Sequence, residues 1–106
     1  MKISGKITEF VLYKYVERKL GKYDIHIVHF IPGRIRLQSP QWKTNISLLE
    51  KVVNELRTQP IVYSVHPTPV TGSMVITFDA SYLTNLEKID SWFQALNQVY
   101  RTEYMK

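Results

Sequence analysis

Apolar and polar residues alternate along residues 23–38, which is the pattern of a β-strand with one buried face. Successive side chains of a strand point to opposite faces, so one set is predicted to face a core and the other an open sheet face. The predicted core set is Ile25, Ile27, Ile31, Ile35 and Leu37, with His29 and Gly33 in the same phase. The opposite set is Val28, Phe30, Arg34 and Arg36. Because Pro32 cannot donate a ladder hydrogen bond and Gly33 favours a kink, we expect a bend there, across which the phase can slip.

Two later segments have apolar residues at helical spacing. In residues 43–58 the stripe is Ile46, Leu49, Val53 and Leu56, and Pro60 closes the helix. In residues 85–100 the stripe is Leu86, Ile89, Phe93, Leu96 and Tyr100. Residues 61–66 and 74–79 are predicted strands, separated by a turn rich in proline and glycine.

Residues 3–20 are compatible with two structures. A helical stripe is formed by Ile3, Ile7, Phe10, Val11 and Leu20, with Lys6, Lys14 and Arg18 around it and Gly21 as the stop. Residues 10–16 are also rich in strand-forming side chains. We predict a helix and keep a strand as the alternative. A basic amphipathic helix can lie on an anionic membrane or dock on a partner, and it can equally pack on its own domain or pair with a second copy.

The resulting order of elements predicts an α+β fold of the ferredoxin-like (split βαβ) type. The first and second strands would be parallel with the third between them, and both later helices would cover one face. A fourth strand is predicted to be missing or short, since only residues 101–106 follow the last helix. The free edge is expected to be covered by that tail, by residues 3–20 or by a second chain. We divide the chain into a basic amphipathic N-terminal extension, residues 1–22, and a ferredoxin-like domain, residues 23–106.

The chain of 106 residues suffices for one domain and carries a formal net charge of +5. Residues 1–24 hold six basic and three acidic side chains, residues 25–43 hold three basic and no acidic ones, and residues 44–106 hold five and six. Such a distribution favours anionic partners: phosphates, nucleic acid, an anionic membrane face or an acidic protein. A solvated basic surface that maintains solubility gives the same pattern.

The chain has no cysteine, which excludes disulfides, zinc fingers and a Cu(I) thiolate site. Small secreted domains usually need disulfides, no signal peptide is apparent, and no run approaches the roughly 20 apolar residues of a membrane span. We therefore expect a cytoplasmic protein, with peripheral contact at the inner membrane face through its basic segment.

The three histidines are the candidate metal or haem ligands. A neutral imidazole suits Fe, Zn, Cu or Ni and is a common axial ligand of haem, and His29 is the first candidate. His26 lies on the opposite face of a regular strand, so the two should not chelate together unless a bulge re-aims one of them. His66 is separated from the first strand by the central one. A single haem ligand, or a site completed by a second chain, needs fewer converging ligands than a zinc site, whereas a histidine that only bonds a backbone carbonyl is the structural alternative.

Arg34 and Arg36 share a face of the predicted strand and are expected to stand side by side on the open side of the sheet. Two guanidiniums so placed can hold a carboxylate, a phosphate or a haem propionate. A surface pair that contacts Asp or Glu is the structural alternative.

Several short motifs occur in order at sensible spacings. His29–Leu37 gives His-x-x-Pro-Gly-Arg-x-Arg, Val62–Val65 gives Val-x-x-Val, and Thr71–Asp79 gives a Thr-Gly-Ser turn and a strand that ends in Asp. Over about residues 24–100 the chain resembles the divergent heavy-metal-associated domains. The resemblance implies a ferredoxin-like fold, metal or metallo-cofactor homeostasis, and the neighbourhood of P-type cation-transporting ATPases. Cysteine-bearing members carry Cys-x-x-Cys after the first strand for Cu(I), but residues 39–44 have no thiol, so the copper-chaperone mechanism does not carry over.

We therefore predict a non-enzymatic module that handles iron, another divalent metal or haem through His29, beside a P-type cation ATPase. The alternative is a metal-free interaction or dimerisation module that docks through its basic N-terminal segment on a membrane or a partner. No nucleophile motif, phosphate loop or carboxylate pair predicts an enzyme. RNA binding is not expected, because the predicted third strand offers only Val75 and Thr77 to the open face, where base stacking needs aromatics.

Overall fold

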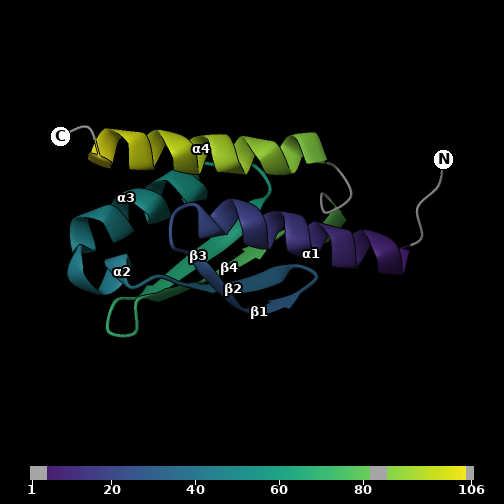
Figure 1. The fold of residues 1–106 in the computed structure, drawn as a ribbon, viewed down its shortest axis with the longest axis horizontal. Helices are drawn as coiled ribbons and strands as arrows, with labels where there is room; N and C mark the ends of the chain where they lie inside the picture. The colour runs from purple at the N-terminus through teal and green to yellow at the C-terminus, as the bar shows by residue number, and fades with distance from the viewer. Residues whose placement is uncertain (1–4, 82–85, 105–106) are drawn as a thin grey trace.

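The computed structural model describes residues 5–81 and 86–104, with helices on one side of a four-stranded sheet (Figure 1). The helices are α1 (Gly5–Gly21), α2 (Gln41–Thr44), α3 (Ile46–Arg57) and α4 (Leu86–Tyr104). The strands are β1 (His26–Ile31), β2 (Arg34–Gln38), β3 (Val62–Thr68) and β4 (Ser73–Phe78). Outside the described residues lie Ile3, Asn85 and the last two residues of the tail, and the side chains of Ile7, Phe10, Leu86 and Ile89 are not described either.

The predicted helices form for local reasons that the sequence contains. Residues 5–21 are helical, which confirms the helix rather than the strand for this segment. α3 begins later than predicted because Asn45 caps it: the Asn45 side-chain oxygen accepts a hydrogen bond from the Leu48 N–H at 3.0 Å. The capped helix buries Leu48, Leu49, Val52, Val53 and Leu56, whereas Ile46 is 44% exposed.

The single strand predicted over residues 23–38 is wrong, because this segment is a hairpin. β1 and β2 pair antiparallel with Ile31 opposite Arg34, so Pro32 and Gly33 form a two-residue turn. Gly33 has a φ of +90°, and a proline followed by a glycine with positive φ fits a type II turn. The expected bend is therefore a complete reversal of the chain.

The sheet has the order β1-β2-β4-β3, and every neighbouring pair is antiparallel. β2 and β3 are consequently parallel to each other, with β4 between them and α3 as their connection. This arrangement confirms the ferredoxin-like fold class. The fourth strand, predicted to be missing or short, is present, because β1 occupies the free edge of β2. Neither the tail nor α1 is needed to fill that position.

The hydrophobic core lies between the sheet and the helical layer, which consists of α1, α3 and α4 (Figure 1). The sheet contributes Ile35, Leu37, Val65, Met74, Ile76 and Phe78, each at most 5% exposed. Trp42 is fully buried, and its Nε1–H donates to the Tyr100 hydroxyl at 3.1 Å. α1 belongs to the same layer, because Leu20 is 3% exposed and the Tyr15 hydroxyl donates to the Asp90 carboxylate on α4.

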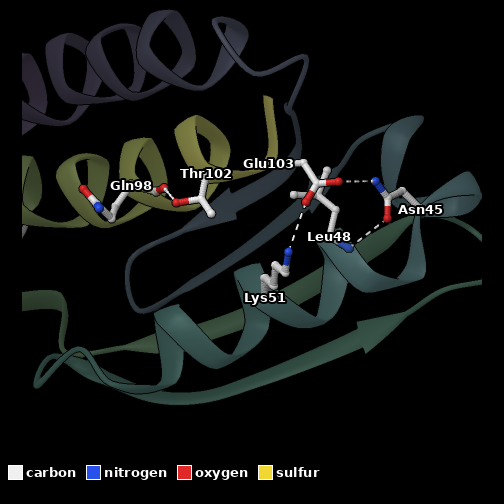
Figure 2. Close-up of polar contacts among 6 residues, drawn as sticks. All are labelled: Asn45, Leu48, Lys51, Gln98, Thr102 and Glu103. Atoms are coloured by element: carbon white, nitrogen blue, oxygen red, sulfur yellow. Dashed lines mark hydrogen bonds and ion pairs between the residues drawn. The ribbon is translucent and has the colours of Figure 1, made fainter. Parts of the chain in front are cut away.

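Polar contacts also join α3 to α4 at the C-terminal end of α4 (Figure 2). The Glu103 carboxylate accepts a hydrogen bond from the Asn45 side-chain amide at 2.9 Å and pairs with the Lys51 ammonium at 3.2 Å. Asn45 therefore caps α3 and anchors α4 at once. The helices are fixed to one another on this side of the sheet, and none of the described helices covers the opposite side (Figure 1).

Candidate functional site: the uncovered face of the sheet

The side of the sheet that faces away from the helices is covered by none of the described helices, and we call it the open face. Its members are the outward residues of each strand, as the register and the buried residues between them show. They are His26, His29 and Ile31 on β1, Arg34, Arg36 and Gln38 on β2, Ser73, Val75 and Thr77 on β4, and Ser64, His66 and Thr68 on β3, of which Ser73 alone among these residues is buried. All three histidines and both candidate arginines lie on this one face.

A β-bulge in β1 decides which residues reach the open face. Ile27 pairs with Leu37 and His29 pairs with Arg36, so Val28 is an extra residue in β1. Beyond the bulge the phase of the strand is inverted. Phe30 packs against the core, with its ring 6.0 Å from that of Tyr13, and Ile31 is 45% exposed. The faces predicted for His29, Phe30 and Ile31 are therefore wrong, and the slip occurs before the Pro-Gly turn rather than at it.

His29 lies directly beside Arg36 in the register of the hairpin. Directly opposed residues of antiparallel strands have Cα atoms about 4.5–5.5 Å apart and point to the same side. The same row continues through Val75 of β4 to His66 of β3. Three strand spacings of about 4.8 Å separate His29 from His66, so these two imidazoles cannot bind one ion.

His26 lies on the same face as His29, contrary to the expectation for a regular strand. Its ring Nε2 is 3.0 Å from the Asp24 Oδ1, and both side chains are more than half exposed. Asp24 has a φ of +60°, an uncommon conformation for a residue with a side chain, at the junction between α1 and β1. Asp24 was not among the candidate site residues predicted from the sequence. Its position two residues before the candidate ligand His26 is the one feature of the sequence that could have indicated it.

The two arginines stand on the open face as predicted. Arg34 and Arg36 are exposed, whereas Ile35 and Leu37 between and after them are buried. Among the described residues, neither guanidinium has an ion-pair partner, so the alternative of a pair held by Asp or Glu finds no support there. Each carries five N–H donors on an exposed side chain.

Between the described helices and the sheet, the interior holds only a small cavity. An apolar cavity of about 40 Å³ lies between α1, α4 and the sheet, lined by residues such as Val16, Phe30 and Trp92. This is far below the roughly 300–1,000 Å³ of a small-molecule pocket, so a porphyrin does not fit inside. Two larger surface grooves, one beside α1 and α4 and one beside α3, are lined by no histidine. All three histidines therefore lie on the open face, and none of them lines these cavities.

No group of three His, Asp or Glu side chains among the described residues could hold a metal ion. A closed zinc site of three or four protein ligands is therefore not formed by this part of the chain. Asp79, the acid that ends β4, is occupied locally: its Oδ1 accepts from the Ser81 hydroxyl at 2.7 Å and from the Ser81 N–H at 3.0 Å. These two bonds hold the pKa of Asp79 below its usual value.

The fold and the open face define a small ferredoxin-like α+β module whose candidate chemistry is metal ligation by histidine. Residues 11–98 match the family described as heavy metal associated domain 2, and the chain belongs to this family. The resemblance predicted from the motifs is confirmed, and the match begins inside the predicted extension. Membership suggests metal binding or metal handling. Domains of this kind are generally non-enzymatic, and they often partner with metal transporters or ATPases.

No curated protein and no solved structure matches the chain. In the part of the chain that the structure describes, no helix is both long and apolar enough to cross a membrane.

Proposed function

We propose that this protein is a non-enzymatic module that binds a metal or haem on the open face, with His29 as the metal ligand. The observation that supports it is the register of β1 and β2, in which His29 and Arg36 are directly opposed residues and both are exposed. An imidazole supplies a bond to iron or another first-row metal, and the guanidinium next to it compensates negative charge on the bound group.

Haem fits this surface better than a bare ion fits His29 alone. It is flat and needs an axial ligand, an apolar contact and partners for two carboxylates. His29 would supply the ligand, Ile31 and Val75 the apolar contact, and Arg34 and Arg36 the propionate contacts. Ile31 is 45% exposed, so its side chain is available for contact. Among the described residues, neither arginine has an ion pair that would have to break before it could bind a propionate.

The partner we propose is a P-type cation-transporting ATPase, with the module in the cytoplasm at the inner face of the membrane. Family membership supports a transporter as the partner class. The exposed basic side chains of α1, such as Arg18, would suit an anionic surface. The division at residue 22 stays a prediction, although Leu20 and Tyr15 pack into the same core as the rest of the chain.

A haemin titration followed by absorbance tests the proposal, with metal analysis of the same purified protein. We expect a saturable Soret shift that is lost in His29→Ala and retained in His66→Ala, because His66 is on the same face but out of reach. Arg36→Gln should weaken the affinity by about 10- to 150-fold, since a charge-assisted hydrogen bond contributes about 1.5–3 kcal/mol, and it should leave the Soret position unchanged.

A titration without any Soret shift, from a protein that contains no metal and binds no added divalent ion, would refute the proposal. The weight would then move to the alternative of a metal-free module that docks through its basic N-terminal segment. Deletion of residues 1–22 would next be assayed for lost association with vesicles, with a partner or with a second copy.

A further inference from the structure

We infer that His26 and His29 together chelate a first-row divalent ion, with Ni(II) and Zn(II) as the probes, and that the bulge at Val28 creates this pair. The inference rests on the proposed metal-handling function and names a bare divalent cation as a ligand of the same face. It differs from the haem proposal because it requires His26 as well as His29.

The register gives the spacing of the pair. His26 lies opposite Gln38, and His29 lies opposite Arg36. Arg36 and Gln38 are two positions apart on a regular strand, so their partners are separated by about 6.7 Å along the sheet, on one face. Imidazole nitrogens bind Zn(II) at about 2.0–2.1 Å, and two side chains at this separation can converge on one ion. Without the extra residue, His26 and His29 would point to opposite faces.

Asp24 orients one member of the pair. Its Oδ1 lies 3.0 Å from the His26 Nε2, which leaves Nδ1 of that ring to face a metal. A carboxylate that bonds the second nitrogen of a metal-bound imidazole fixes the ring and raises its basicity. Because the described residues contain no three-ligand cluster, we assign Asp24 to orientation rather than to direct ligation.

Two protein ligands leave at least two coordination positions of the ion to water. An ion held in this way is exposed on the open face, and ligands of an acceptor protein can replace those waters before the imidazoles leave. Such a site suits delivery of an ion rather than storage, in contrast to a closed structural site with four protein ligands.

Calorimetric titration of the full chain with Ni(II) or Zn(II) tests the pair. We expect His26→Ala and His29→Ala each to weaken binding by more than about tenfold, and Asp24→Ala by about tenfold, as is typical when an orienting carboxylate is removed. His66→Ala is the matched control and should bind like the wild type. Equal thermal melts would show that the variants fold.

A variant that gains affinity is a stronger test, because lost binding can also result from a variant that does not fold. Gln38→His adds a third imidazole opposite His26, where one more protein ligand can replace a bound water, so it should tighten Ni(II) binding by about tenfold or more. Thr68→His adds an imidazole on the same face of β3, beyond reach, and should change nothing. An unchanged affinity in Gln38→His would overturn the convergence of these side chains on one ion.

The two proposals fail in different ways. Haemin binding that needs His29, together with divalent-ion binding that is indifferent to His26→Ala, overturns the chelate and leaves the haem proposal intact. Divalent-ion binding that needs both histidines supports the chelate whatever haemin does. No binding of either ligand refutes both.

Discussion

The two faces of the sheet are formed by the same strands but differ in composition: one is apolar and buried, and the other is largely polar and exposed. On the side of the helices, the inward residues of β2 and β4 are apolar and nearly fully buried, as Leu37 at 4% and Ile76 at 0% exposure show. On the open face, the residues next to them along the strands include Arg36 and Thr77. Burial of apolar area stabilises the fold, whereas exposed polar groups contribute little. Exposed residues such as Arg36 contribute little to the stability of the fold. The open face is therefore where residues with another role are expected.

The largest expected effect is the difference in the free energy of unfolding between substitutions of two neighbouring residues of β2. Leu37→Ala should lower the free energy of unfolding by about 2–5 kcal/mol, because it leaves a cavity against the helices. Arg36→Ala should change it by less than about 0.5 kcal/mol, because the side chain is exposed and lacks an ion-pair partner among the described residues. Urea denaturation measures both. An Arg36 cost as large as that of Leu37 would show that the open face is structural after all.

A smaller effect is expected for the hydroxyl of a tyrosine on the covered side. Tyr100→Phe leaves the fully buried Trp42 Nε1–H without its acceptor, which should cost about 1–3 kcal/mol. Tyr63→Phe removes the same atom from a side chain that is 71% exposed, and it should be neutral. Thermal or urea unfolding of the two variants gives the difference directly. Equal costs would contradict the contrast between buried and hydrated polar groups.

The same contrast explains what the sequence predicted and what it missed. The phase of Arg34, Ile35, Arg36 and Leu37 was predicted correctly, because β2 is a regular strand with one buried face. The fold class followed from the order of helices and strands. The covered face is thus readable from apolar periodicity, which arises from burial.

The faces of the β1 residues could not be predicted from apolar periodicity, for a physical reason. Val28 is apolar but 52% exposed, and nothing in its side chain marks it as the extra residue of a bulge. The alternation also continues across the Pro-Gly turn, so a hairpin and a bent strand have the same pattern. The pairing of His29 with Arg36, and the approach of Asp24 to His26, depend on that register and could not be derived before it was known.

A third prediction concerns how firmly α1 belongs to the covered side. Tyr15→Phe removes the hydrogen bond to Asp90 and should cost about 0.5–1.5 kcal/mol at neutral pH. Tyr13→Phe is the control on the same helix, since its ring contact with Phe30 survives the change. If α1 does not contribute to the stability of the domain, neither variant should lower the free energy of unfolding. That result would support residues 1–22 as a separate extension.

The dependence of this effect on pH has a defined sign. The hydrogen bond to Asp90, followed by burial and the charge of Asp90, raises the pKa of Tyr15 above its ordinary value of 10.0. As far as the ionisation of Tyr15 is concerned, the stabilisation is therefore fully present below about pH 10, the unfolded value, and is lost as pH rises through the raised pKa. Urea midpoints for wild type and Tyr15→Phe should converge in that alkaline range. Midpoints that stay equally far apart throughout the alkaline range would contradict the assignment.

The smallest expected effect has the opposite sign and belongs to the open face. Arg34 and Arg36 are two positions apart on one strand face, about 7 Å, where two unit charges in water repel by about 0.6 kcal/mol before screening. Arg34→Gln should therefore raise stability by about 0.2–0.5 kcal/mol at about 0.01 M ionic strength and by nothing measurable at about 1 M, where the Debye length is about 3 Å. The same variant should bind haemin more weakly. A residue that lowers stability slightly and raises ligand affinity is retained for binding. A loss of stability in Arg34→Gln at low salt would show instead that Arg34 has a structural partner, and the two faces would then differ less than the buried areas indicate.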